Sequence, residues 1–204
     1  MLRRSAALGA VAAVPPTVLA QAARAAPYVN LTAAEAATLE AIVARLIPAD
    51  GNGPGAFEAG AARYIDGALG DALAAQRPAY AAGLAALEAF SRAQAGESFA
   101  TLPAGRQDEL LTLVEQNQAT GFTPSSAAFF ELVLGHTLEG TFGDPHYGGN
   151  QDFVGWELIG YPGLRLAVTA EQQGMAAALE PVHSSAYDHA QFEAHTTAGE
   201  RHDD

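Results

Sequence analysis

The sequence predicts an all-α protein: a single-domain bundle of about five helices, with a long ordered loop region rich in glycine and aromatic residues near the C-terminus. Three observations lead to this prediction. Apolar residues recur every three or four positions in five separate stretches between residues 31 and 142, which is the spacing of a helix face. No stretch sustains the apolar–polar alternation of a half-buried strand. A chain of 204 residues fits one domain with a sizeable core.

The first predicted helix lies in residues 31–48, LTAAEAATLEAIVARLIP. Thr32 and Glu35 have the spacing of a capping box, in which each side chain binds the backbone amide of the other residue. Pro48 ends the helix, because a proline ring is incompatible with a helix interior. Five apolar residues share one face: Leu39, Ile42, Val43, Leu46 and Ile47.

Four further helices are predicted over residues 57–73, 77–96, 102–118 and 123–142. Each is preceded by a stretch that contains proline or glycine, which is typical of a connection between helices. The apolar residues that define them include Phe57, Tyr64, Ile65 and Leu69 in the first, Tyr80, Leu84, Leu87 and Phe90 in the second, Leu110, Leu111, Leu113 and Val114 in the third, and Phe129, Phe130, Leu132, Val133 and Leu138 in the fourth.

The character of the chain changes after Phe142. Residues 143–164, GDPHYGGNQDFVGWELIGYPGL, mix glycine and proline with aromatic residues, and such loops are ordered because the aromatic rings pack. From about Pro181 the apolar periodicity is lost. The predicted organisation is therefore an export signal over residues 1–25, a helical domain over residues 26–180, and a flexible acidic, histidine-containing tail over residues 181–204.

The charge and the composition exclude several functions. The net charge of −13 argues against nucleic acid as a partner, because binding phosphate requires a basic surface. The same charge disfavours binding to an anionic lipid surface. The absence of cysteine excludes disulfides, thiolate nucleophiles, and iron–sulfur or zinc sites with cysteine ligands.

The N-terminus has the features of an export signal. Arg3 and Arg4 precede a weakly hydrophobic stretch that ends in Ala23-Arg24-Ala25, an A-x-A-like cleavage site. The arginine pair resembles a twin-arginine signal, and two prolines in the apolar stretch argue against a membrane-spanning helix. The alternatives are an ordinary secretory signal or an N-terminal tail. We expect export to the periplasm.

A group of titratable residues around the end of the last predicted helix suggests a divalent metal. His136 and Glu139 are three residues apart and share a helix face, and Asp144 and His146 follow closely in the loop. Two imidazoles with carboxylates are a usual minimum for a catalytic metal. The spacing matches no recognised ligand motif, so the same residues fit equally a turn in which Asp144 binds backbone amides.

Other catalytic motifs are absent from the sequence. GNGPG lacks the context of a phosphate-binding loop, no dinucleotide fingerprint follows a strand, and no G-x-S-x-G elbow occurs. Gly155-Trp156 and the GYPG segment, residues 160–163, suit close contact, since glycine lets backbones approach and aromatic residues anchor interfaces. They could form an interface, cover the end of the helical domain, or do both.

At these residues the chain resembles the gluconate 2-dehydrogenase subunit 3 family, which includes the small (gamma) subunits of membrane-associated FAD-dependent sugar dehydrogenases. The resemblance consists of an arginine-pair leader, LTAAEAATLEAIVARLIPAD with a following PGA, then DPHYGGN, and finally GWELIGYPG. It covers about residues 31–164. The last two blocks are its specific part, and the helices between them are generic.

The resemblance implies a non-catalytic subunit. Its partners are expected to be a large FAD-containing flavoprotein of the glucose–methanol–choline type and a multihaem cytochrome c. FAD and haem c are then held by those partners, and this chain holds no cofactor. The small subunit is expected to escort the flavoprotein through export and to support its folding, in a complex that associates with the membrane without a direct membrane span by this chain.

We therefore expect residues of the two specific blocks to form or support the docking surface. They are Asp144, Pro145, His146, Tyr147, Gly148, Gly149, Asn150, Gly155, Trp156, Tyr161, Pro162 and Gly163. The rival hypothesis is a stand-alone metal-dependent periplasmic enzyme that uses His136, Glu139, Asp144 and His146. A third is an independent binding module in which the aromatic residues line a ligand cleft.

Overall fold

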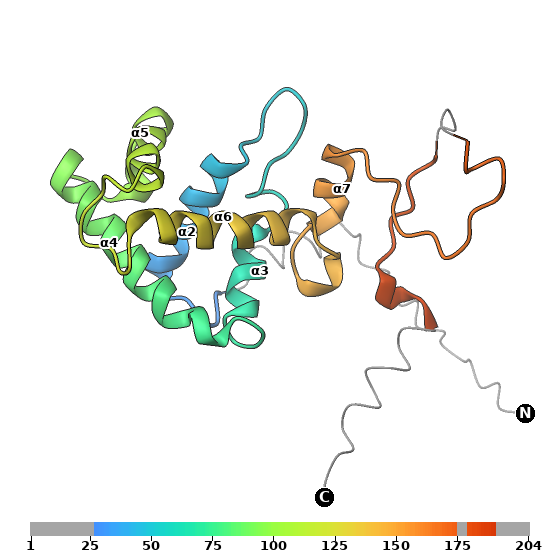
Figure 1. Ribbon diagram of the computed structural model, residues 1–204, viewed down its shortest axis with the longest axis horizontal. Coiled ribbons are helices and arrows are strands. Elements are labelled where there is room, and N and C mark those ends of the chain that lie inside the picture. Colours follow the sequence, from blue (N-terminus) through green and yellow to red (C-terminus); the bar gives the residue numbers. More distant parts are fainter. Residues whose placement is uncertain (1–26, 175–178, 191–204) are drawn as a thin grey trace, which may run out of the picture.

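The computed structural model describes residues 27–174 and 179–190, and over these residues the protein is all-helical with no strand (Figure 1). The all-α prediction is therefore confirmed. The helices are α2 (Ala33–Leu46), α3 (Ala61–Ala68), α4 (Arg77–Ala95), α5 (Ala104–Glu115), α6 (Ser126–Phe142) and α7 (Val154–Leu158). The first five correspond to the five predicted helices. The sixth, α7, lies in the stretch that the sequence assigned to a loop.

Helix α6 organises the bundle. It packs against α2, α3, α4 and α5, and Figure 1 shows it running across them with its C-terminal end toward α7. Phe129 and Val133 on α6 are buried among the apolar residues of the neighbouring helices. The core is completed by residues that the periodicity predicted, among them Leu39, Ile42, Val43, Ile65, Leu84, Leu87, Leu110 and Val114.

The capping box predicted for the first helix is present. The Thr32 hydroxyl oxygen accepts a hydrogen bond from the Glu35 amide at 3.3 Å, and the Glu35 carboxylate accepts one from the Thr32 amide at 2.8 Å. Together these two bonds satisfy amides that a helix N-terminus leaves without intrahelical partners. The start of α2 is thus set by two side chains within one turn, and their spacing can be recognised in the sequence.

The second predicted helix is shorter than the periodicity indicated. It begins only at Ala61, because Gly60 has a φ of 75° and ends the preceding turn in a left-handed conformation. It ends at Ala68, and turns and a short 3₁₀ segment lead from there to α4. The apolar pattern over residues 57–73 therefore describes a helix flanked by packed turns.

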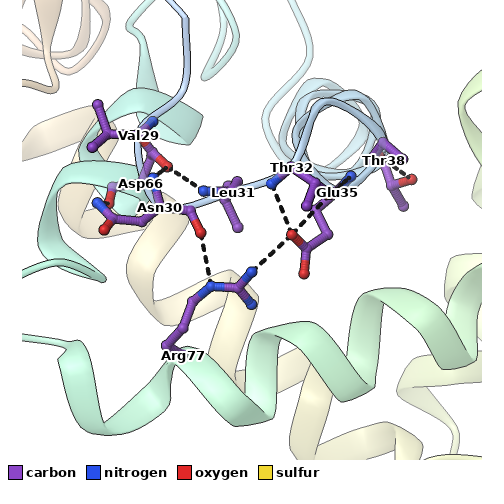
Figure 2. Close-up of polar contacts among 9 residues, drawn as sticks. Val29, Asn30, Leu31, Thr32, Glu35, Thr38, Asp66 and Arg77 are labelled. Carbon is purple, nitrogen blue, oxygen red and sulfur yellow. Dashed lines mark hydrogen bonds and ion pairs between the residues drawn. The ribbon is translucent and has the colours of Figure 1, made fainter.

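Asp66 of α3 fastens the N-terminal segment to the bundle, and Figure 2 shows its carboxylate facing the backbone of that segment. The two carboxylate oxygens accept hydrogen bonds from the amides of Val29, Asn30 and Leu31, each 2.8 Å long. Arg77 of α4 donates to the Asn30 carbonyl and to Glu35, both at 2.8 Å, and so ties the same segment to the start of α2. We call Asp66 and residues 29–31 the N-terminal clamp.

The described residues that follow α6 lie beyond its C-terminal end, where Figure 1 shows α7 and the coloured segments after it. Residues 143–163 cover that end of the helix, and we call them the end cap. Within the part of the chain that the structure describes, no helix combines the length and apolar character that crossing a bilayer requires.

Candidate interaction surface

The end cap begins with a tight turn over Asp144–Tyr147, which we call the DPHY turn. The Asp144 carboxylate accepts a hydrogen bond from the His146 amide at 2.9 Å, and Pro145 supplies the fixed φ of the short 3₁₀ helix that follows. His146 is exposed, and Tyr147 is 57% exposed. The turn thus presents two rings at the surface of the protein.

Asp144 also binds a segment far along the chain. Its carboxylate accepts hydrogen bonds from the Ser185 hydroxyl at 2.6 Å and from the Ala186 amide at 2.9 Å. Burial acts to raise the pKa of Asp144, but the hydrogen bonds from Ser185, Ala186 and His146 outweigh it and hold that pKa below its ordinary value. The carboxylate is therefore ionised at neutral pH and organises both segments.

The rings of the DPHY turn form a cluster with Tyr187. The His146 ring stacks on the Tyr187 ring with centroids 3.8 Å apart, and the Tyr147 and Tyr187 hydroxyls are 2.7 Å apart. That hydroxyl contact is the main cause that raises the pKa of Tyr147. Residues 181–190, which the sequence assigned to the tail, thus include side chains that contact the DPHY turn.

Asn150 connects the end cap to α6 from inside. Its side chain is fully buried, donates to the Gly143 carbonyl at 2.9 Å and accepts from the Gly155 amide at 2.8 Å. The backbone amide of Asn150 donates to the Gly140 carbonyl at 2.7 Å. A buried amide side chain with these partners stabilises a single loop conformation.

Two glycines allow the end cap to touch α6. A Cβ atom at Gly149 would lie 2.1 Å from the Gly140 carbonyl oxygen, and one at Gly155 would lie 1.8 Å from the Thr141 carbonyl oxygen. The close approach of backbones that was predicted at Gly155 is present, and the same approach occurs at Gly149. It joins two parts of the same chain.

Trp156 closes the end of α6. Its indole N–H donates to the Phe142 carbonyl at 2.9 Å, one of the last carbonyls of the helix, and the residue is only 7% exposed. Tyr161 packs edge-on against the indole with centroids 4.9 Å apart and stays 40% exposed. Trp156 is thus a structural residue of the end cap, whereas Tyr161 also faces outward.

The predicted docking residues therefore divide into two groups. Gly149, Asn150, Gly155, Trp156 and Gly163 are buried, and they hold the end cap together. His146, Tyr147, Gly148 and Tyr161 are exposed, while Asp144, Pro145 and Pro162 are intermediate. The exposed group, with its intermediate neighbours, is the part of the prediction that another molecule can reach.

A groove of about 550 Å³ runs between the DPHY turn and α3. His146, Tyr147 and Gly148 line one side, and Tyr64 and Asp71 are among the residues on the other. In this groove tyrosine and histidine rings lie beside polar groups. This composition is typical of protein–protein contact.

The four residues of the metal hypothesis do not converge. His136 Nδ1 lies 2.9 Å from the hydroxyl of the buried Tyr80, and the Glu139 carboxylate accepts a hydrogen bond from Tyr64 at 2.9 Å. Burial lowers the pKa of His136 below its ordinary value, against an opposing effect of Glu139. The described residues contain no group of three or more histidine, aspartate or glutamate side chains placed to hold a metal ion.

Sequence reasoning missed the residues beyond the end cap that touch it. Ser185 and Tyr187 contact the DPHY turn, and His183 stacks on Phe153 with centroids 4.9 Å apart. Their stretch has no apolar periodicity, so no local pattern could have identified them. Arg3, Arg4, Ala23 and Ala25, the predicted export signal, lie outside the described residues.

The fold and the surface define a class of protein: a helical chain with a loop-built surface at one end that suits contact with another macromolecule. The chain belongs to the gluconate 2-dehydrogenase subunit 3 family, whose family model matches residues 33–163. The match contains α2 to α7 and the whole end cap, and it confirms the resemblance found in the sequence. Comparisons with curated proteins and with solved structures gave no match.

Proposed function

We propose that this chain is the non-catalytic small subunit of a periplasmic FAD-dependent dehydrogenase complex that oxidises a sugar or sugar acid of the gluconate or glucose type. In this role the chain escorts the flavoprotein subunit through export and stabilises its fold. The observation that carries the proposal is the family match over residues 33–163, which contains the exposed rings of the end cap.

The proposed docking surface is the exposed part of the end cap. Tyr147 and Tyr161 are large aromatic residues that remain 57% and 40% exposed beside buried, hydrogen-bonded neighbours. Tyrosine on a rigid support loses little conformational entropy when it is covered, which is why it is enriched at interfaces. Asp144, Asn150, Gly155 and Trp156 support this surface from beneath.

The proposed partners supply the redox chemistry. A large flavoprotein of the glucose–methanol–choline type holds FAD, and a multihaem cytochrome c receives the electrons. The proposed arginine-pair leader, with Arg3 and Arg4, directs the chain and its bound flavoprotein to the periplasm by the twin-arginine route. The complex associates with the membrane through its other subunits.

Co-expression with the flavoprotein tests the docking surface. The double variant Tyr147→Ala with Tyr161→Ala is expected to reduce the affinity for the flavoprotein on the order of thirtyfold, because aromatic anchors dominate binding energies. Phe57→Ala is the matched control, since Phe57 is 49% exposed but lies outside the end cap. Equal recovery of the flavoprotein with both variants contradicts the proposed surface.

The escort role is tested separately. Replacing Arg3 and Arg4 together by lysine is expected to leave the flavoprotein inside the cell, folded and active, because an export address is recognised by a receptor and lysine does not replace the guanidinium group. Flavoprotein activity in each cell fraction is the measurement. A flavoprotein that matures and is exported equally well without this chain refutes the function.

A further inference from the structure

We propose that the end cap contains a peptide-binding site that the chain's own residues 182–188 occupy, and that the flavoprotein docks there by displacing them. We call residues 182–188 the strap. The proposal rests on the proposed function for the identity of the partner. The site itself rests on the contacts and burial of the strap.

The strap is held by every second residue. His183 lies 3.4 Å from the Glu157 carboxylate and stacks on Phe153, and the Ser185 hydroxyl donates to Asp144 at 2.6 Å. Tyr187 stacks on His146 at 3.8 Å. Residues 182–185 have no regular secondary structure and Ala186–Asp188 forms a short 3₁₀ helix, and side chains from both parts contact the end cap.

Backbone contacts complete the binding of the strap. The Val182 amide donates to the Pro162 carbonyl at 3.0 Å, and the Ala186 amide donates to Asp144 at 2.9 Å. A Cβ atom at Gly163 would lie 2.0 Å from the Val182 carbonyl oxygen, so the strap backbone lies directly against the end cap. The strap thus touches both specific blocks of the sequence.

The boundaries of the family match separate the site from its occupant. Residues 33–163 contain the partners Asp144, His146, Phe153, Glu157 and Pro162, and they contain no residue of the strap. The residues that contact the strap therefore lie inside the family match, whereas the strap itself lies outside it.

The strap fits the site imperfectly, which makes it displaceable. In the described part of the chain, three buried side-chain atoms have no hydrogen-bond partner: Arg165 Nε, Ser184 Oγ and His189 Nε2. All three lie in the strap or beside it, and each such atom lowers the stability of the bound state. Of the strap residues, only Ser185 is buried, so little apolar area opposes release.

The chemistry of the site specifies the displacing segment. Asp144 accepts hydrogen bonds from a hydroxyl and an amide, His146 and Phe153 offer ring faces, and Glu157 attracts a cation. The partner's segment therefore has a serine or threonine, an aromatic residue two positions later, and a basic residue two positions earlier. Every position matches one group of the site.

Two neighbouring serines provide a matched test in the full chain. Ser185→Ala removes a hydroxyl that donates to Asp144 and accepts from the Tyr187 amide at 3.0 Å, whereas Ser184→Ala removes a hydroxyl without a partner. We expect Ser185→Ala to speed hydrogen exchange at the Ala186 amide about fivefold, the usual effect of one hydrogen bond, and to tighten flavoprotein binding by a similar factor. Ser184→Ala is expected neither to speed hydrogen exchange at the Ala186 amide nor to tighten flavoprotein binding.

Two results overturn the proposal. Unchanged exchange in Ser185→Ala shows that this contact does not hold the strap. Faster exchange with equal or weaker flavoprotein binding shows that the partner does not compete with the strap.

A synthetic peptide of residues 180–190 separates this proposal from the proposed function. We expect the peptide to bind Ser185→Ala more tightly than the unaltered chain, because the released strap competes less for the site. If the flavoprotein binds neither chain, the proposed function and the displacement both fail, and the peptide then decides whether the site exists. If the peptide binds neither chain, the end cap contains no such peptide-binding site.

Discussion

Two aspartates hold distant segments onto this protein in nearly the same way, yet they differ in what surrounds them. Asp66 accepts three backbone amides of the N-terminal clamp, and Asp144 accepts an amide of its own turn together with a hydroxyl and an amide of the strap. Asp66 is 5% exposed, whereas Asp144 lies at the edge of the end cap. The same hydrogen-bonding device therefore works in two environments.

The surroundings decide how permanent each attachment is. The clamp brings Leu31 into the core, and Arg77 adds a hydrogen bond to the Asn30 carbonyl and another to Glu35 at the start of α2. The strap adds no buried apolar side chain, and its rings stay partly exposed. A carboxylate fixes a segment firmly when water is excluded from it, and the same contact at the surface can open locally. Burial of the carboxylate, and not the number of its hydrogen bonds, therefore separates a permanent attachment, an anchor, from one that can open, a latch.

The largest expected effect comes from Asp66→Asn. The amide group of asparagine cannot accept all three backbone amides, so at least one N–H group loses its partner and the charge that strengthened these bonds is gone. We expect the free energy of unfolding to fall by about 3 kcal/mol, measured by urea denaturation.

Two further variants provide the control and the comparison for the stability of Asp66→Asn. Asp71→Asn, at an exposed position after α3, is the control and is expected to change stability by less than about 0.5 kcal/mol. Asp144→Asn is expected to cost about 1 kcal/mol, because its partners stay near water. Equal losses for Asp66→Asn and Asp144→Asn break the distinction between anchor and latch.

The sequence predicted the parts of this molecule whose signals are local. Thr32 and Glu35 form their predicted cap because both partners lie within one turn, and the five main helices follow from periodicity. Helix α7 was missed because Val154–Leu158 has only five residues, too few to show a helical period. The clamp and the strap were missed because Asp66 and Asp144 reach partners more than thirty residues away.

The glycines of the end cap show a second limit of sequence reasoning. Gly155 was predicted to permit close approach, and it does, as does Gly149, but the approaching backbone is that of α6. A glycine in a sequence indicates that another group approaches the backbone closely, but it does not identify that group. The partition of the end cap into buried supports and exposed rings therefore required the structure.

The next largest effect tests whether the end cap is a rigid support for the strap. A methyl group at Gly155 would lie 1.8 Å from the Thr141 carbonyl oxygen, which must move to admit it. We expect Gly155→Ala to lower stability by about 2 kcal/mol, seen as a fall in Tm of about 6 °C. Gly135→Ala on α6 is the matched control, since nothing lies within 4 Å of the added methyl, and it is expected to raise stability by about 0.5–1 kcal/mol. A Gly155→Ala protein as stable as the unaltered chain means that the end cap is not joined firmly to α6.

The smallest effect is the pH dependence of the strap. The pKa of Asp144 is held below its ordinary value of 3.8 in the folded protein, so the ionised form is favoured with the strap bound. Its contribution to stability is therefore complete above the ordinary pKa and is lost as the pH falls through the lower, folded value. The resonance of the Ala186 amide, followed by NMR from pH 7 downward, is expected to keep the shift of the bound strap to about pH 4 and to lose it below that. Asp144→Asn abolishes this step, because an amide does not titrate in this range. A step that survives in Asp144→Asn assigns the acid release to another group, and the latch would then depend on a contact other than the carboxylate of the DPHY turn.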